Sequence, residues 1–475
     1  IATGSFGAGL VVDKDKDERR LNDFQACYVE KTWGRSTVTV GNFLVTSGHG
    51  LVFSDAYGES PSTADPWRIG RGAFGVRTST AARENSFLRG AAVALAGKAW
   101  DLCVVGSSAD FDVALDAGGR VTSLNEAGTH VTASEVKGRD ALREDLAGLV
   151  CRARHAGLRA TASLEAARLS RAFAFDVLDW PAHATRIAGG LDLAYEQDDA
   201  VVFGEGALGA KGSAALAGLA VRRPHTDVLL VGRRYAPEYA SLHSAPFAFY
   251  SGLGKGERGL FTLIKFKPAA NGELAISTDV HQELRADGAL RPHGSETNLD
   301  LAIDSGPFTL ALGEKLAASE DPPSASAALR DSVGTEETTR LRSRLDVGYA
   351  PRRGISFRAR YEALTATEAE AGATTRATSD VLRFDLTLAA FKPFKLDAGC
   401  YVFSVANWAA RIYQYEAGVP YYPTLELLKS DGSRWYAAVS WEARRLGKLA
   451  AKYGRTRYQD GEGHSEMLAS FSLKM

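Results

Sequence analysis

The chain has no long hydrophobic run. A helix that crosses a bilayer needs roughly 18–20 consecutive apolar residues, whereas apolar stretches such as 90–97 and 214–221 are far shorter. If this protein lies in a membrane, it must cross with strands closed on one another, because every backbone group in lipid has to be paired within the protein. A signal-peptide pattern is also missing and the chain opens on Ile1, which leads us to expect a processed or N-terminally incomplete chain.

Cysteine is scarce and net charge is nearly absent. Cys27, Cys103, Cys151 and Cys400 lie far apart without a C-x-x-C pair, which argues against zinc ribbons and thioredoxin-type sites. The 56 basic and 57 acidic residues leave a net charge of −1, so we expect no direct nucleic-acid binding, which usually requires a basic excess. With 24% charged and 45% apolar residues, the composition excludes global disorder.

What the sequence does contain is alternation of apolar and polar residues. In 381–388, Leu382, Phe384, Leu386 and Leu388 share one face of a strand and Arg383, Asp385 and Thr387 share the other. Similar segments recur almost from end to end, and side chains of a strand alternate between its two faces. A soluble sandwich turns the polar face to water, whereas a membrane barrel turns it to the lumen and the apolar face to lipid. The alternation alone leaves both architectures open.

The spacing of these segments predicts an all-β fold of roughly 20–26 strands, within the range of transmembrane antiparallel β-barrels. We expect residues 1–475 to form a single barrel, with short turns such as Asn271-Gly272 alternating with long loops on one side. The long loops are expected at 108–145, 236–257, 315–338 and 406–431, an inward-folded plug segment at 46–66, and one helix at 134–149. Aromatic residues near strand ends are typical of an interfacial girdle; they are Tyr349, Tyr361, Trp435, Tyr436, Trp441, Tyr453 and Tyr458.

Several segments resemble a family of large outer-membrane β-barrel proteins of Bacteroidetes, Chlorobi and related bacteria, named for a helix-hairpin-helix module. The similar segments are, in the family's order, 40–53 (VGNFLVTSGHGLVF), 128–135 (GTHVTASE), 203–207 (FGEGA), 256–260 (GERGL), 411–416 (RIYQYE), 432–436 (GSRWY) and 452–458 (KYGRTRY). At 49 the chain has His where the family usually has Gln.

This resemblance implies an outer-membrane location and a barrel architecture. It implies no activity, and the helix-hairpin-helix module does not occur in these residues, so DNA binding by that module is not expected here. The final Phe471, Leu473 and Met475 alternate as in a closing barrel strand, although such strands commonly end on an aromatic residue.

Motifs that carry chemistry are weak. Gly204, Gly206 and Gly209 follow an apolar segment and match G-x-G-x-x-G, but a turn and another strand follow in place of the helix that a dinucleotide site needs. His49 and His130 lie near acidic residues without a second histidine at ligand spacing, so we expect no metal site. Ser134 near His130 is not a convincing nucleophile and base. We therefore predict no catalytic, cofactor-binding or metal-binding residues.

Charged residues inside the family-like segments form the candidate site. They are Glu205, Glu257, Arg411, Glu416 and Arg434. One interpretation is a lumenal network that holds an inward-folded loop, since carboxylate–guanidinium pairs are geometrically specific; the other is a set of ordinary lumen or loop residues satisfied by water.

The sequence therefore predicts a non-enzymatic outer-membrane β-barrel, a porin- or transporter-like conduit with a charged lumen. Its expected partners are outer-membrane lipids and periplasmic or surface proteins. The alternative is a sealed barrel that anchors a cell-envelope or surface assembly through its long loops. A membrane enzyme and a soluble all-β binding protein are weaker alternatives, and extraction without detergent would identify the latter.

Overall fold

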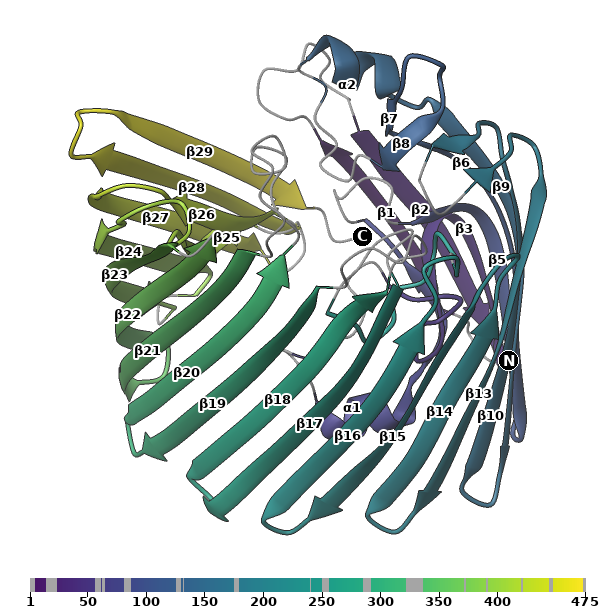
Figure 1. Ribbon diagram of the computed structural model, residues 1–475, viewed down its shortest axis with the longest axis horizontal. Helices are drawn as coiled ribbons and strands as arrows, with labels where there is room; N and C mark the ends of the chain where they lie inside the picture. Colours follow the sequence, from purple (N-terminus) through teal and green to yellow (C-terminus); the bar gives the residue numbers. More distant parts are fainter. Residues whose placement is uncertain are drawn as a thin grey trace. The chain divides into compact units, whose positions relative to one another are not determined.

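The computed structural model is almost entirely β-structure (Figure 1). It describes the chain apart from these residues: 1–4, 14–23, 56–60, 62–64, 81–86, 125–129, 131, 175–178, 240, 250–255, 285–291, 322–335, 371–372, 390–391, 420–421, 444–446 and 473–475. The core of the predicted loop 315–338 and parts of the other predicted loops and of the plug segment therefore lie outside the described residues.

The chain divides into two compact units. Unit 1 comprises residues 1–223, 227–262 and 281–291, and unit 2 comprises 224–226, 263–280 and 292–475. One antiparallel sheet of 23 strands accounts for most of both units, which confirms the predicted fold class and strand number.

In unit 1, neighbouring strands of the large sheet pair antiparallel from β1 to β15. The first part of β3 pairs with β5 and its last part pairs with β4. The strands are β1 (Phe6–Asp13), β2 (Phe24–Trp33), β3 (Ser36–Gly48), β4 (Ala73–Thr78), β5 (Leu88–Ala96), β6 (Trp100–Phe111), β9 (Leu142–His155), β10 (Leu158–Leu169), β13 (Thr185–Gln197), β14 (Ala200–Leu208), β15 (Ser213–Arg223) and β16 (Thr226–Tyr235). Strands β17 (Gly256–Ala269) and β18 (Gly272–Leu284) contribute to both units.

In unit 2, consecutive strands of the large sheet again pair antiparallel, from β19 to β29. They are β19 (His293–Ser305), β20 (Phe308–Asp321), β21 (Glu336–Arg352), β22 (Ile355–Glu370), β23 (Ala373–Leu388), β24 (Phe394–Ser404), β27 (Gly432–Ala443), β28 (Gly447–Tyr458) and β29 (Gly463–Ser472).

The remaining elements lie in the long connections. Unit 1 has a small sheet of β7 (Val113–Leu115), β8 (Val121–Leu124), β11 (Phe173–Ala174) and β12 (Asp179–Trp180), and two short helices, α1 (Pro66–Arg71) and α2 (Ala133–Gly138). Unit 2 has a separate hairpin of β25 (Ile412–Val419) and β26 (Tyr422–Leu428). No helix of the described residues is long and apolar enough to span a bilayer.

Burial in the sheet is the inverse of that in a soluble protein. On β23 the Arg383 side chain is 1% exposed while the adjacent Phe384 is 51% exposed. On β13, Asp192 is buried between the exposed Leu191 and Leu193, and the same inversion recurs along the other strands. A water-facing sheet would present its charges and cover its large apolar side chains. The exposed apolar face fits lipid, and the fold is the transmembrane antiparallel β-barrel class that bacterial outer membranes hold.

Connection length alternates along the chain as expected for such a barrel. Two-residue turns, for example 34–35, 156–157 and 306–307, alternate with long connections such as 49–72 and 405–431. Stacked aromatic side chains lie at turn ends of neighbouring strands: the Phe308 and Tyr349 rings are 4.8 Å apart, and the Tyr349 and Phe357 rings 6.5 Å apart. Exposed aromatics at strand ends are typical of the membrane interface.

Three predictions need correction. The helix expected at 134–149 is wrong: α2 ends at Gly138, and from Leu142 the alternating sequence forms β9. The loops expected at 108–145 and 406–431 are too long, because the first contains the end of β6, β7, β8, α2 and the start of β9 and the second contains the β25–β26 hairpin. Tyr436 and Tyr458 do not belong to an outer girdle, since both are buried on the charged face.

Candidate functional site

In unit 1, the last two residues of β3 and the six that follow fold onto the charged face of the sheet. We call residues 47–54 the inner segment; its Leu51, Val52 and Phe53 are almost fully buried. Gly48 has a φ of +54°, and a Cβ there would lie 2.7 Å from the Asp192 Cβ. The chain can therefore turn this closely onto β13 only because residue 48 is glycine.

His49 fixes the inner segment to two neighbouring strands. Its Nδ1 lies 2.6 Å from Asp192 Oδ2 on β13, and its backbone amide donates to Glu205 Oε2 on β14 over 2.6 Å. The ring also stacks on Phe203, with 4.6 Å between centroids. His49 itself lies within the predicted plug region 46–66.

The imidazole of His49 is held from both ring nitrogens. Nδ1 faces the Asp192 carboxylate and Nε2 faces the Ile69 carbonyl oxygen, 2.8 Å away. Because the Ile69 carbonyl oxygen can only accept, Nε2 carries the hydrogen of that contact. The contact to Ile69 also ties the inner segment to α1, which packs on β14 and β15 through Gly70 beside Val201 and Ala220.

A second connection covers the inner segment. We call residues 236–249, after β16, the inner connection. The Tyr239 hydroxyl donates to the Leu51 carbonyl, and Ser241 Oγ donates to the Val52 carbonyl over 3.0 Å. Buried backbone carbonyls are costly without a partner, so the two segments stabilise each other.

His243 joins the inner connection to the sheet. Its Nε2 lies 2.8 Å from Glu144 Oε1 on β9, and its backbone carbonyl accepts from the Ser54 amide at 2.8 Å. Burial lowers the pKa of this imidazole, but the nearby carboxylates of Glu144 and then Glu165 outweigh that effect and raise the pKa to about 9. His243 is therefore a protonated cation at neutral pH.

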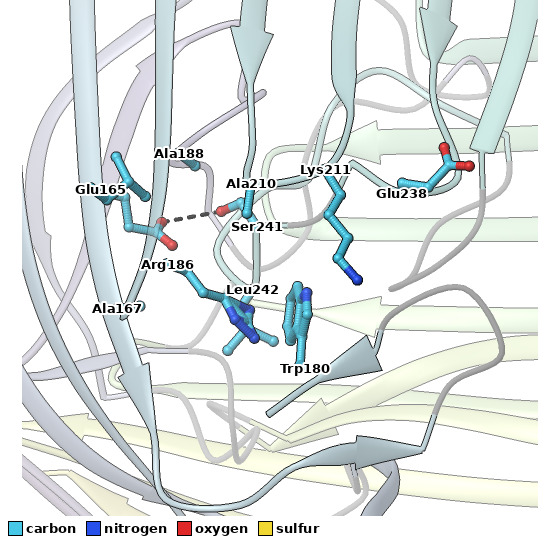
Figure 2. A pocket seen from close by; sticks show the side chains of 11 residues that line it. Glu165, Ala167, Trp180, Arg186, Ala188, Ala210, Lys211, Glu238, Ser241 and Leu242 are labelled. Atoms are coloured by element: carbon cyan, nitrogen blue, oxygen red, sulfur yellow. Dashed lines mark hydrogen bonds between the residues drawn. The ribbon is translucent and has the colours of Figure 1, made fainter. Parts of the chain in front are cut away.

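A small pocket of mixed charge lies beside this region, between β10, β13 and the inner connection (Figure 2). Arg186 lies over the Trp180 ring, and Ser241 Oγ lies 3.1 Å from Glu165 Oε2 across one wall. Lys211 and Glu238 line the other side.

In unit 2, the β25–β26 hairpin, here the inner hairpin, packs on the charged face through buried ions. Arg434 of β27 donates from Nε to Glu416 Oε1 over 2.7 Å and from Nη2 to Glu466 Oε2 over 2.9 Å. Lys452 of β28 donates to Glu416 Oε2, also over 2.7 Å. The side chains of Arg434, Lys452 and Glu416 are fully buried.

Two further contacts extend this cluster. The Tyr401 hydroxyl donates to Glu416 Oε1 over 2.6 Å, and Arg434 Nη1 lies 3.4 Å from Glu426 Oε1 on β26. Glu416 therefore receives hydrogen bonds from β24, β27 and β28 together. A carboxylate with this many charged donors is a specific anchor for the hairpin.

A second buried arginine holds the hairpin backbone. Arg383 Nη1 donates to the Tyr415 carbonyl over 2.6 Å while its Nε donates to Asp385 on its own strand. Gln414 of the hairpin donates to Glu362 on β22 over 3.1 Å. The inner face of the hairpin is thus bound to the wall, and its other face exposes Tyr413, Tyr415 and Leu425.

The predicted site residues belong to separate clusters. Glu205 holds the inner segment, and Glu257 accepts from Arg233 and from the Phe249 amide at the end of the inner connection. Glu416 and Arg434 meet directly, as described above. Arg411 lies away from that cluster: its guanidinium stacks on Trp408 and donates to the Trp408 carbonyl over 2.8 Å.

Sequence reasoning missed Asp192, Lys452 and Glu466. Their partners are distant in the sequence, 143 residues apart for His49 and Asp192. The sequence did offer one signal: the alternation along each strand places all three residues on the charged face. Alternation does not show which residue on another strand is the partner.

Comparisons with known proteins give structural likeness only. No family matches the sequence and no curated protein matches it. Among solved structures, a mutant ferric enterobactin receptor of Pseudomonas aeruginosa is 10% identical, with a TM-score of 0.44 over 80% of this chain and 68% of that one. The ferric-catecholate import receptor Fiu of E. coli K12 is 9% identical, with a TM-score of 0.45 over 94% of this chain and 78% of that one. The outer-membrane channel DcaP of Acinetobacter baumannii is 10% identical, with a TM-score of 0.34 over 76% and 98%. The fold assignment rests on the sheet itself.

Proposed function

We propose that this protein is a non-enzymatic conduit of the bacterial outer membrane whose charged lumen is narrowed by inward-folded segments. The observation that carries the proposal is the inverted wall: apolar side chains face outward along the strands while arginines, carboxylates and histidines face inward. A lumen without transport duty could be filled by apolar side chains, as small barrels are.

Partly exposed cations support a polar path along unit 2. On β21 and β22, Arg342, Arg344 and Arg358 are each more than a third exposed although they pair with Glu362, Asp346 and Asp385. Rings of charged side chains are one way in which pores select ions. The charged face of these strands is therefore available to solvated ions or small polar solutes.

The inner segment in unit 1 and the inner hairpin in unit 2 each cover part of the charged face. We propose that each of them narrows the space along the part of the charged face that it covers, because each is fixed to the strands of its own unit by buried side chains.

The test is conductance in planar bilayers. Purified protein is expected to give small, discrete channels, and a variant in which a short Gly-Ser turn replaces residues 412–428 is expected to give several-fold larger ones. Folded protein that gives no conductance in either form would reject the conduit.

The alternative is a sealed barrel that anchors a cell-envelope or surface assembly. It is favoured by the exposed Tyr413 and Tyr415 of the inner hairpin and by the exposed Trp408 just before it, since aromatic residues are enriched at protein interfaces. Reproducible partners in a pull-down from outer membranes, lost when Tyr413 and Tyr415 are changed to serine, would support the scaffold.

A further inference from the structure

We propose that His49, Asp192 and Glu205 form a binding site for one divalent first-row transition-metal ion, which fixes the inner segment to the sheet. Each residue offers one ligand atom, and the three atoms lie within 4.8 Å of one another. The site stands independently of the proposed conduit.

The ligands come from three elements that the fold brings together. Asp192 and Glu205 are direct cross-strand partners on β13 and β14, and His49 reaches both from the turn after β3. Like charges directly opposite each other on adjacent strands are destabilising. A cation between the two carboxylates removes that repulsion.

The burial of the three side chains also supports a metal site. All three side chains are at least nine-tenths buried, with His49 4% and Asp192 2% exposed. Charges buried this deeply are normally paired or bound to metals. Among the described residues, Arg159 of β10 is a cation that interacts with Asp192, and Glu205 is held by the His49 and Leu51 amides.

One carboxylate oxygen of Asp192 is available to bind a metal ion. Asp192 Oδ1 is buried and makes no hydrogen bond within the described part of the chain, and neither does the hydroxyl of Ser47, next to Gly48. Buried polar atoms are almost always satisfied. A metal bound by Asp192 through both oxygens would satisfy Oδ1.

The donor set determines the class of metal. One imidazole nitrogen with two carboxylates suits zinc and its first-row neighbours better than magnesium or calcium, which prefer all-oxygen sites. The His49 Nδ1 to Asp192 Oδ2 distance of 2.6 Å must open by less than about 1 Å to admit zinc, whose bonds to nitrogen and oxygen are about 2.0–2.2 Å.

The experiment is cobalt and zinc titration of the refolded full chain in detergent after chelator treatment. We expect one equivalent of Co²⁺ to give a ligand-field absorption band that Zn²⁺ abolishes. Glu205→Gln and His49→Gln are each expected to weaken binding at least about tenfold. Glu196→Gln is the matched control, because Glu196 lies on the same strand, β13, and pairs with Arg71 instead.

Hydrogen exchange supplies a second readout. Zn²⁺ is expected to slow amide exchange in peptides covering 47–54 of the wild type and of Glu196→Gln, but not of Glu205→Gln. If cobalt gives no band, or binds equally in Glu205→Gln, the proposal is wrong, and His49 then contacts the two carboxylates through hydrogen bonds alone. If Glu205→Gln fails to fold, the wild-type titration and His49→Gln decide the outcome in the same way.

Discussion

At the scale of single residues, the buried Arg434 side chain fixes the inner hairpin to the sheet. Its guanidinium donates to Glu416 and Glu466 and lies near Glu426. Arg434→Ala leaves Glu416 and Glu466 with Lys452 as their one cationic partner among the described residues, and breaking a buried ion pair costs about 3–5 kcal/mol. We expect a clear fall in the temperature at which the folded form is lost, followed by heat-modifiable gel migration, with faster protease cleavage of the 406–431 connection.

The control for this prediction is Arg411→Ala. Like Arg434, Arg411 lies in a family-like segment, but it stacks on Trp408 in a partly exposed position. Its loss should therefore change the free energy of unfolding by less than about 0.5 kcal/mol. Equal effects of the two substitutions, or none from either, would contradict the anchoring role of Arg434.

Tyr239 allows a smaller and more local test. Tyr239→Phe removes the hydroxyl that donates to the Leu51 carbonyl, which leaves a buried acceptor without this donor at a cost of about 1–3 kcal/mol. The expected result is faster hydrogen exchange confined to the inner segment and the inner connection. Tyr195→Phe serves as the control because Tyr195 is exposed on the opposite face of β13; exchange that rises equally in both variants would refute the prediction.

Local sequence identified which charges are unusual but not what they contact. Glu416 and Arg434 stood out because they fall in family-like segments, and the structure brings them together. Lys452 lies in such a segment too, yet nothing local distinguishes a lysine buried against Glu416 from one facing water. Partner identity depends on strand register, which local sequence does not encode.

At the scale of elements, the inner connection is expected to respond to pH. His243 is held as a cation by Glu144 and Glu165, which in turn face Arg186. Its pKa of about 9 lies above the ordinary value of about 6.5, so the stabilisation is complete below pH 6.5 and is lost as pH rises through 9. We expect protease cleavage in 236–249 to accelerate between pH 6.5 and 9.5.

His243→Gln supplies the control for this pH dependence. Glutamine can still donate to Glu144 but carries no titrating charge, so the pH dependence of cleavage should be clearly weaker in this variant over the same range. A wild-type connection that becomes more resistant to protease at high pH would contradict the stabilising role of the His243 cation.

The predicted element boundaries agree with the structure where apolar and polar residues alternate regularly. They are wrong at the start of β9 and in the connection that contains the inner hairpin. The segment from Leu142 alternates buried and exposed residues through Val150, yet most of it was included in the helix predicted at 134–149. A capping box at Thr132 and Glu135 does start a helix there, but only α2 forms before the strand period takes over. The inner hairpin was missed because its alternating residues, Tyr413 to Glu416, lie inside a long polar connection.

At the scale of the whole molecule, the direction of the apolar face was the open question. Alternation predicted 20–26 strands and the sheet has 23, but alternation is the same whichever face meets water. Exposure resolves it, because Phe357 and Phe384 face outward while Arg383 is buried. Sequence could not supply that answer, since it depends on which face the inward segments cover.

The decisive prediction places one charge on each face of β23. Phe384→Arg puts a cation on the outer face of β23, four residues before the strand ends at Leu388. Such a cation costs about 2–4 kcal/mol at the centre of a bilayer, whereas an exposed site in water tolerates the change within about 0.5 kcal/mol. Thr375→Arg, an exposed position on the opposite face of the same strand, is the control and should be neutral. Urea unfolding in lipid vesicles, followed by tryptophan fluorescence, measures both. Equal stability of Phe384→Arg and the wild type, together with extraction of the protein without detergent, would mean that the apolar face does not meet lipid.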